Sequence, residues 1–113
     1  MSNRRLSSSG IKVYASIFAA LGDETRLSVL ARLAGGAPHS ITALTAGTKL
    51  TRQAVTKHLK VLEDVGVVRA SKVGRESQFA LEPKAIDDAR AYLEHVSRQW
   101  DDALARLKAF VED

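Results

Sequence analysis

A group of polar and cationic side chains near the middle of the chain has the chemistry needed to contact nucleic acid. It belongs to the run from Thr51 to Val65 and consists of Arg52, Gln53, Thr56, Lys57 and Lys60. Arg and Gln can make paired hydrogen bonds to guanine and adenine edges, whereas Thr and Lys reach backbone phosphates. These residue types therefore predict a DNA-binding face.

The same run is predicted to be a helix. Val55, Leu59 and Leu62 fall at helical spacing and form one apolar stripe, with the polar group on the other side. Thr51 precedes the run and can cap it by accepting a hydrogen bond from the first turn. We also include Thr51 in the predicted DNA-binding set.

The first turns of such a helix usually enter the major groove, which favours Arg52, Gln53 and Thr56 as base-reading residues. A charged outer face is equally typical of an ordinary solvated helix. The run taken alone therefore leaves both interpretations open.

The segments on either side of this helix complete a known arrangement. A short apolar segment at residues 40–46 ends at Gly47, and two strand-like runs at 67–73 and 77–81 follow the helix. Gly74-Arg75 between these runs matches a two-residue hairpin turn with glycine first. Two helices around a glycine turn with a hairpin behind predict a mainly α fold with a small β-hairpin wing, the winged helix-turn-helix.

Basic residues are concentrated in this region. Residues 1–81 contain 12 Lys and Arg against 5 Asp and Glu, whereas residues 82–113 contain 5 against 8. Arg75, at the tip of the expected hairpin, is placed to reach a minor groove or a phosphate, although a solubilising turn residue would occupy the same position. A basic cluster that coincides with the groove-binding elements is the electrostatic pattern of a nucleic-acid binder.

Three segments resemble the ArsR (arsenic-repressor-like) family of winged-helix regulators. They are residues 18–33 with an Asp-x-Thr-Arg entry to a helix, residues 50–68 with a Thr-Lys-His-Leu recognition helix, and residues 74–79 with a Gly-Arg wing. The resemblance implies a homodimeric repressor that binds an operator in double-stranded DNA and releases it when an effector arrives.

Many members of that family sense metals, but the sequence does not favour this for the present chain. It has no cysteine, so the thiolate pair of such sensors has no counterpart near residues 40–44. His39, His58 and His95 lie in separate expected elements and offer no i,i+4 ligand pair. We interpret His39 as a turn residue and His58 as a half-buried packing residue, with DNA contact as the alternative for His58. The sequence is similar to the cysteine-free branch of the family, with no metal or cofactor expected.

The C-terminal part is predicted to form one long helix at about residues 83–112. Eight apolar residues between Ile86 and Phe110 repeat at alternating spacings of three and four. This pattern predicts a helix of ~45 Å packed on a partner helix, because such a length extends past a domain of ~13 Å radius of gyration. Covering the chain's own core is the alternative. With a second stripe at residues 11–21, the expected homodimer interface comprises Tyr14, Phe18, Ile86, Leu93, Val96, Trp100 and Leu107.

Another helix is predicted after Asp23, whose carboxylate can cap its first turn. Leu27, Leu30 and Leu33 are expected to point inward, and Gly35-Gly36 to end the helix.

Length and composition indicate one domain at residues 10–113, preceded by a disordered basic arm at residues 1–9. No segment approaches the ~20 apolar residues of a membrane-spanning helix, so no membrane partner is expected. Absence of cysteine fits a reducing interior, and we expect a cytoplasmic, nucleoid-associated protein. Phosphate-binding glycine loops and nucleophile motifs are missing, so an enzyme is not expected.

The sequence thus predicts a DNA-binding transcriptional regulator, namely a homodimeric repressor that binds an inverted-repeat operator and responds to an effector of unknown chemistry. One alternative is a winged-helix module for protein–protein contact. Another is a metal-responsive repressor whose ligands are histidine and carboxylates on the last helix, where Asp87, Asp88, Glu94 and His95 lie.

Overall fold

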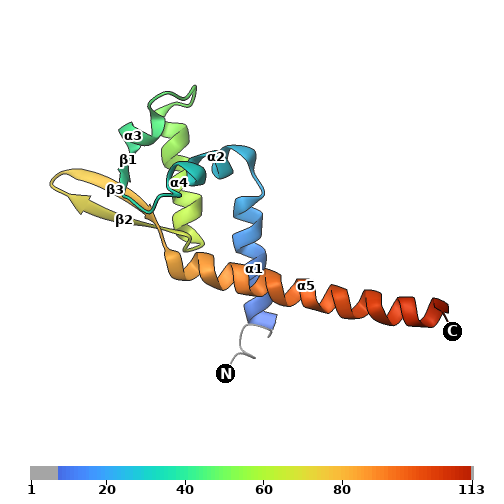
Figure 1. Ribbon diagram of the computed structural model, residues 1–113. Helices are drawn as coiled ribbons and strands as arrows, with labels where there is room; N and C mark the ends of the chain where they lie inside the picture. The colour runs from blue at the N-terminus through green and yellow to red at the C-terminus, as the bar shows by residue number, and fades with distance from the viewer. Residues whose placement is uncertain (1–7, 113) are drawn as a thin grey trace.

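The computed structural model describes residues 8–112 of the chain, and the side chains from residue 10 onward. The arm predicted at residues 1–9 lies for the most part outside the described residues, and the first helix begins earlier than expected, at Ser8. The described part contains five helices and three strands, whose arrangement can be followed in Figure 1. In chain order they are α1 (Ser8–Leu21), α2 (Glu24–Arg32), β1 (His39–Ser40), α3 (Ile41–Thr45), α4 (Arg52–Asp64), β2 (Val68–Val73), β3 (Glu76–Leu81) and α5 (Pro83–Glu112).

Helices α3 and α4 form the predicted helix-turn-helix. The turn between them contains Gly47, which has a φ of +76°, a backbone conformation that glycine adopts without a steric penalty. The hydroxyl of Thr51 accepts a hydrogen bond from the backbone N–H of Ala54 at 3.0 Å. This confirms the predicted cap of α4.

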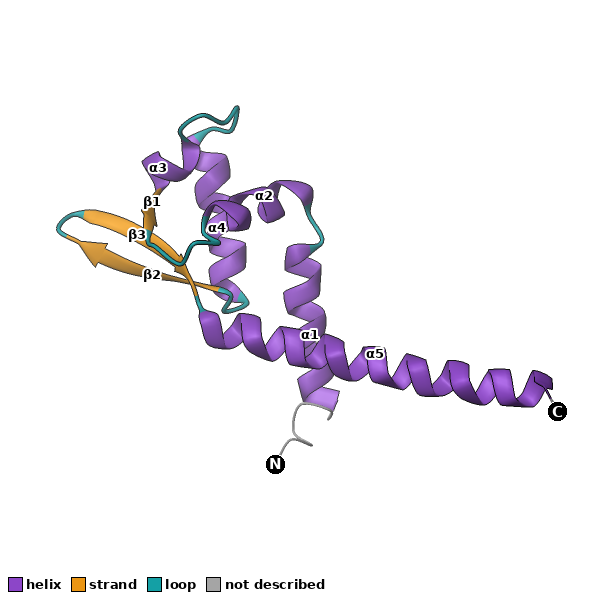
Figure 2. Ribbon diagram, in the orientation of Figure 1, coloured by secondary structure: helices purple, strands orange, loops and turns teal. Residues whose placement is uncertain are grey.

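The hairpin is also confirmed, and it belongs to a slightly larger sheet. Strands β2 and β3 are antiparallel, with Val73 opposite Glu76, so that Gly74 and Arg75 make the two-residue turn. Gly74 has a φ of +66°. The short β1 adds a third antiparallel strand beside β3, with His39 opposite Phe79 (Figure 2). His39 is therefore a strand residue, and its interpretation as a turn residue was wrong.

The core lies where α2, α3, α4 and the sheet meet. Leu33, Leu44, Val55, Leu59 and Leu62 are each at most 1% exposed. One expectation about α2 was wrong: Leu27 is 48% exposed, and Val29 is buried in its place. The helix also ends at Arg32, ahead of the expected Gly35-Gly36.

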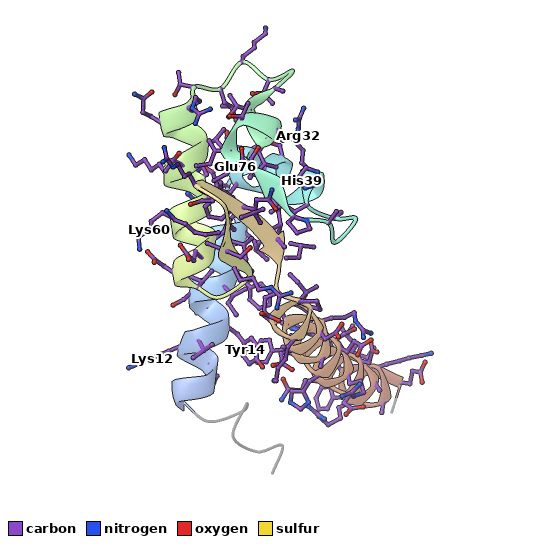
Figure 3. All side chains as sticks on the ribbon, turned by 90° about the vertical axis from the view of Figure 1, so that its left-hand side faces the viewer. Lys12, Tyr14, Arg32, His39, Lys60 and Glu76 are labelled. Atoms are coloured by element: carbon purple, nitrogen blue, oxygen red, sulfur yellow. The ribbon has the colours of Figure 1, made fainter. Side chains whose placement is uncertain are left out.

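Helix α1 is attached to α5 by aromatic packing. The ring of Tyr14 stacks on that of Tyr92, with centroids 4.5 Å apart and planes 14° apart. Figure 3 shows Tyr14 directed from α1 toward α5, whereas Lys12 points away from it.

Helix α5 confirms the predicted long C-terminal helix and gives the molecule its elongated shape. Its C-terminal half extends well beyond the other elements (Figure 1). The radius of gyration is 18.1 Å, against ~13 Å for a compact domain of this size. No helix within residues 8–112 combines the length and apolar character needed to cross a membrane.

Candidate nucleic-acid interface

The outer face of α4 presents the polar group that the sequence singled out. Val55, Leu59 and Leu62 hold the inner face of this helix in the core. Because α-helical residues three and four apart share a face, the side chains on the side of α4 opposite this stripe point outward. The exposed residues of the predicted group are Thr51, Arg52, Gln53, Thr56, Lys57 and Lys60.

Thr56 and Lys60 each make an interaction within α4 itself. The Thr56 hydroxyl donates to the backbone oxygen of Arg52 at 2.8 Å, a bond within the helix. Lys60 Nζ lies 3.1 Å from Asp64 Oδ1, and this hydrogen bond raises the pKa of Lys60 above its usual value. Lys60 therefore stays protonated, but a carboxylate one turn away offsets its positive field.

A cleft of about 510 Å³ separates the start of α4 from the wing. Arg52 of α4 and Arg75 of the hairpin turn both line it, so the structure brings together the two predicted arginines from separate elements. Arg52 Nη1 donates a hydrogen bond to the Thr42 hydroxyl on α3. The remaining lining residues are Ser40, Ile41, Thr42, Glu76 and Ser77.

Sequence reasoning missed the hydroxyl residues of this cleft. Ser40 and Thr42 belong to the start of a short helix, and Ser77 to the wing, so nothing in the local pattern joins them. The available signal was the position of two hydroxyls at the start of the first helix of a helix-turn-helix.

Arg32 at the end of α2 braces the helix-turn-helix and was also missed. Its Nη1 lies 2.8 Å from the carbonyl oxygen of Ala46, 3.3 Å from that of Ala43 and 3.4 Å from that of Leu44. These carbonyls lie at the C-terminal end of α3, where helix carbonyls lack partners of their own and a cation is favourable. A five-residue helix is marginal without such support. No sequence signal could identify Arg32, because all its acceptors belong to the backbone.

The start of α2 is fixed by a charged cap, as predicted. Asp23 Oδ2 accepts from the backbone N–H of Arg26 at 2.9 Å, and this bond holds the pKa of Asp23 below its usual value. His58 is half-buried, as expected, and its Nδ1 atom is buried without a hydrogen-bond partner among the described residues.

The residues expected at a dimer interface fall into two groups. Leu93, Trp100 and Leu107 are 53%, 64% and 58% exposed, and Val96 lies half-buried beside them. The others pack within their own chain: Ile86 and Phe18 are half-buried against the core, and Tyr14 is only 6% exposed. The expected interface residues that remain exposed are therefore on the distal part of α5, where the exposed Leu104, Phe110 and Val111 add further apolar surface.

The predicted absence of a metal site stays a prediction. Within residues 8–112, the acidic and histidine side chains form no group of three or more that could hold an ion.

Comparison with known proteins agrees with this geometry. A family model described as a helix-turn-helix domain matches residues 21–70. The chain is 34% identical over 93 residues to the HTH-type transcriptional regulator Rv2034 of Mycobacterium tuberculosis, covering 82% of this chain and 83% of the relative. It is 39% identical over 66 residues to YuzN, an uncharacterized HTH-type transcriptional regulator of Bacillus subtilis, covering 53% of this chain and 72% of that protein.

Solved structures share the fold. An ArsR-like transcriptional regulator from Rhodococcus sp. RHA1 matches with a TM-score of 0.80 and 36% identity, covering 90% of this chain and 95% of its own. A homodimeric winged helix-turn-helix DNA-binding domain from Mycobacterium bovis matches with a TM-score of 0.65 and 23% identity, over 81% and 84% of the two chains.

Fold and site together define a winged helix-turn-helix transcriptional regulator. The chain belongs to the ArsR family of these regulators, which act by binding DNA and not as enzymes. The resemblance read from the sequence is thus confirmed.

Proposed function

We propose that this regulator is a homodimeric repressor that binds an inverted-repeat operator in the cytoplasm and leaves it when an effector binds. The observation that carries the proposal is the exposed polar face of α4, which faces solvent beside the wing while its apolar stripe anchors it in the core. Such a helix can enter a major groove without unfolding any part of the domain.

The proposed DNA-contacting set is Thr51, Arg52, Gln53, Thr56, Lys57, Lys60 and Arg75. Gln53 is the best candidate for reading a base, because it lies exposed in the first turn of α4 and its amide can bond an adenine edge with two hydrogen bonds. Lys57, one turn further on, is suited to a phosphate. Lys60 contributes least, because Asp64 shares its charge.

The proposed dimer interface is the distal apolar face of α5. A two-helix seam that uses Leu93, Val96, Trp100 and Leu107 would remove this surface from water. Exposed apolar side chains in such number on one helix are typical of protein–protein contact surfaces. The homodimeric domain from Mycobacterium bovis shares the fold and is a precedent for this assembly.

Selection of bound fragments from randomised duplexes tests the function directly. We expect an imperfect inverted repeat with half-sites about 34–36 Å apart, the spacing of one helical turn. Enrichment of no sequence would contradict operator binding and favour the protein–protein module instead. Release of a bound operator by zinc, cadmium or arsenite would favour the metal-responsive repressor. We expect these ions to change operator affinity by less than about twofold, because thiolates and paired histidines are missing.

A further inference from the structure

We infer that the cleft between α3, the start of α4 and the wing is a seat for one DNA backbone phosphate, and that Arg52 binds this phosphate instead of reading a base. The inference rests on the proposed DNA-binding function and changes the role that the sequence suggested for Arg52. A phosphate diester is the ligand because two guanidinium groups and several hydroxyls line the cleft.

The direction of the Arg52 side chain is the first support. Its Nη1 is engaged with the Thr42 hydroxyl, so this end of the guanidinium is held toward α3, while the Arg52 side chain also borders the outer hollow lined by Gln53, Thr56, Lys57 and Lys60. A guanidinium has five N–H donors, and the bond to Thr42 leaves the others for an anion. Thr42 is therefore a positioning residue: it orients Arg52 toward the cleft.

The charge of the cleft is the second support. Neither Arg52 nor Arg75 forms an ion pair with a carboxylate in the described part of the chain, whereas Lys60, Arg69 and Lys84 do. Glu76 is the one acidic residue lining the cleft, and its Oε1 lies 3.4 Å from Gln78 Nε2. Two unpaired cations against one carboxylate leave a net positive cleft, and binding one phosphate would neutralise it.

Position is the third support. The cleft has the recognition helix on one side and the tip of the wing on the other. A helix in the major groove and a wing at the neighbouring minor groove leave one strand of the backbone between them, since a strand separates each pair of adjacent grooves. Ser40, Thr42 and Ser77 provide hydroxyls that can donate to a phosphate oxygen as that strand passes.

The test combines variants of the cleft with DNA that lacks one backbone charge. Arg52→Gln should lower affinity about tenfold on the selected operator and on a random duplex alike, and should reduce the salt slope by about one unit. Glu76→Gln should increase affinity for both duplexes, because it removes the one negative charge of the cleft. Thr42→Val, which keeps the shape but removes the acceptor, should reproduce part of the Arg52→Gln loss.

A single methylphosphonate, placed in turn at each operator position, then locates the contact. At one modified position in each half-site, the wild type and Arg52→Gln should bind the modified operator with equal affinity within about twofold. On that same operator, Lys57→Ala should still show its full loss of affinity. The inference is overturned if Arg52→Gln alters preference at a base pair with an unchanged salt slope, or if no methylphosphonate removes its effect. If no operator is enriched but the Arg52-dependent salt slope appears on random duplexes, operator binding fails and the phosphate seat stands. A wild type that binds neither duplex overturns both.

Discussion

Tyr14 of α1 stacks on Tyr92 of α5 within one chain, with ring centroids 4.5 Å apart. This pair fixes the proximal part of α5 to the domain and leaves its distal part projecting. If α5 carries the contact with a second copy, the stacked pair sets the direction in which that contact is presented.

We therefore expect Tyr14→Ala to lower the free energy of unfolding by ~3–5 kcal/mol, because a large buried ring is lost. Lys12→Ala, on an exposed position of the same helix, should change it by less than about 0.5 kcal/mol. Denaturant unfolding at a fixed protein concentration measures both. Equal effects of the two variants would show that the stacking does not anchor α5.

Gln53 and Lys57 should differ in how their loss depends on DNA sequence. Gln53→Ala should cost ~1–3 kcal/mol on the operator, relax selectivity at one base position and leave binding to random DNA nearly unchanged. Lys57→Ala should weaken binding to every duplex and lower the salt slope by about one unit. Affinities at several salt concentrations separate the two roles. Parallel losses on both kinds of duplex would reassign Gln53 to the backbone.

Arg32 should control the order of α3 more than the stability of the whole domain. Removing its guanidinium leaves carbonyls of residues 43, 44 and 46 without this donor, at a cost of ~1–2 kcal/mol. We expect Arg32→Ala to speed amide exchange in α3 and to weaken operator binding, although Arg32 is not in the proposed DNA-contacting set. Arg98→Ala, at an exposed position on α5, is the matched control and should do neither. Unchanged exchange in α3 would refute the brace.

The cap at Asp23 predicts a defined pH dependence. Because the folded pKa is lowered by the Arg26 N–H, the charged cap stabilises the fold fully above the usual value of 3.8 and loses this effect as the pH falls through the lower folded value. Asp23→Asn keeps an acceptor but does not titrate, so the stability of the wild type relative to this variant should fall only below about pH 4. A constant difference from pH 3 to pH 7 would contradict the charge effect.

Much of the fold could be predicted because local patterns specify it. The apolar stripe of α4, the Thr51 cap and the Gly74-Arg75 turn each depend on residues close in sequence, and the structure has all three. Leu27 was wrongly expected in the core because helical spacing, taken alone, does not decide whether Leu27 or Val29 faces the core. Strand β1 was missed because two residues carry no period, and only pairing with Phe79 defines it.

The candidate site likewise has one part that the sequence predicts and another that it does not. The exposed face of α4 follows from helical spacing, so its members could be named beforehand. The Arg52–Thr42 bond joins two elements across a turn, and nothing in the spacing within either element reveals it. Tyr14 is a second example of what sequence spacing cannot determine. An apolar stripe identifies a helix face that is covered, but only tertiary packing decides whether the same chain or a partner covers it.

The last prediction concerns the distal face of α5, on which operator spacing depends. Leu93 and Trp100 are 53% and 64% exposed in the single chain, so replacing them removes no contact from its core. In a packed dimer seam, losing a side chain such as that of Trp100 costs ~3–5 kcal/mol, and an aspartate at 93 adds a buried charge. Leu93→Asp with Trp100→Ala should therefore give folded monomers that no longer bind the inverted repeat. Every DNA-facing residue is intact in this variant, so the lost binding would come from lost spacing of the half-sites.

Sedimentation, circular dichroism and operator binding on one sample decide whether α5 forms the dimer interface or only covers the core of its own chain. Arg98→Ala with Asp101→Ala changes two exposed polar positions on the same helix and should leave a dimer with normal affinity. Monomers with native helix content and no specific binding support the seam. A double variant at 93 and 100 that stays dimeric, or that binds its operator normally as a monomer, would mean that the exposed face of α5 does not hold the two recognition helices at their spacing.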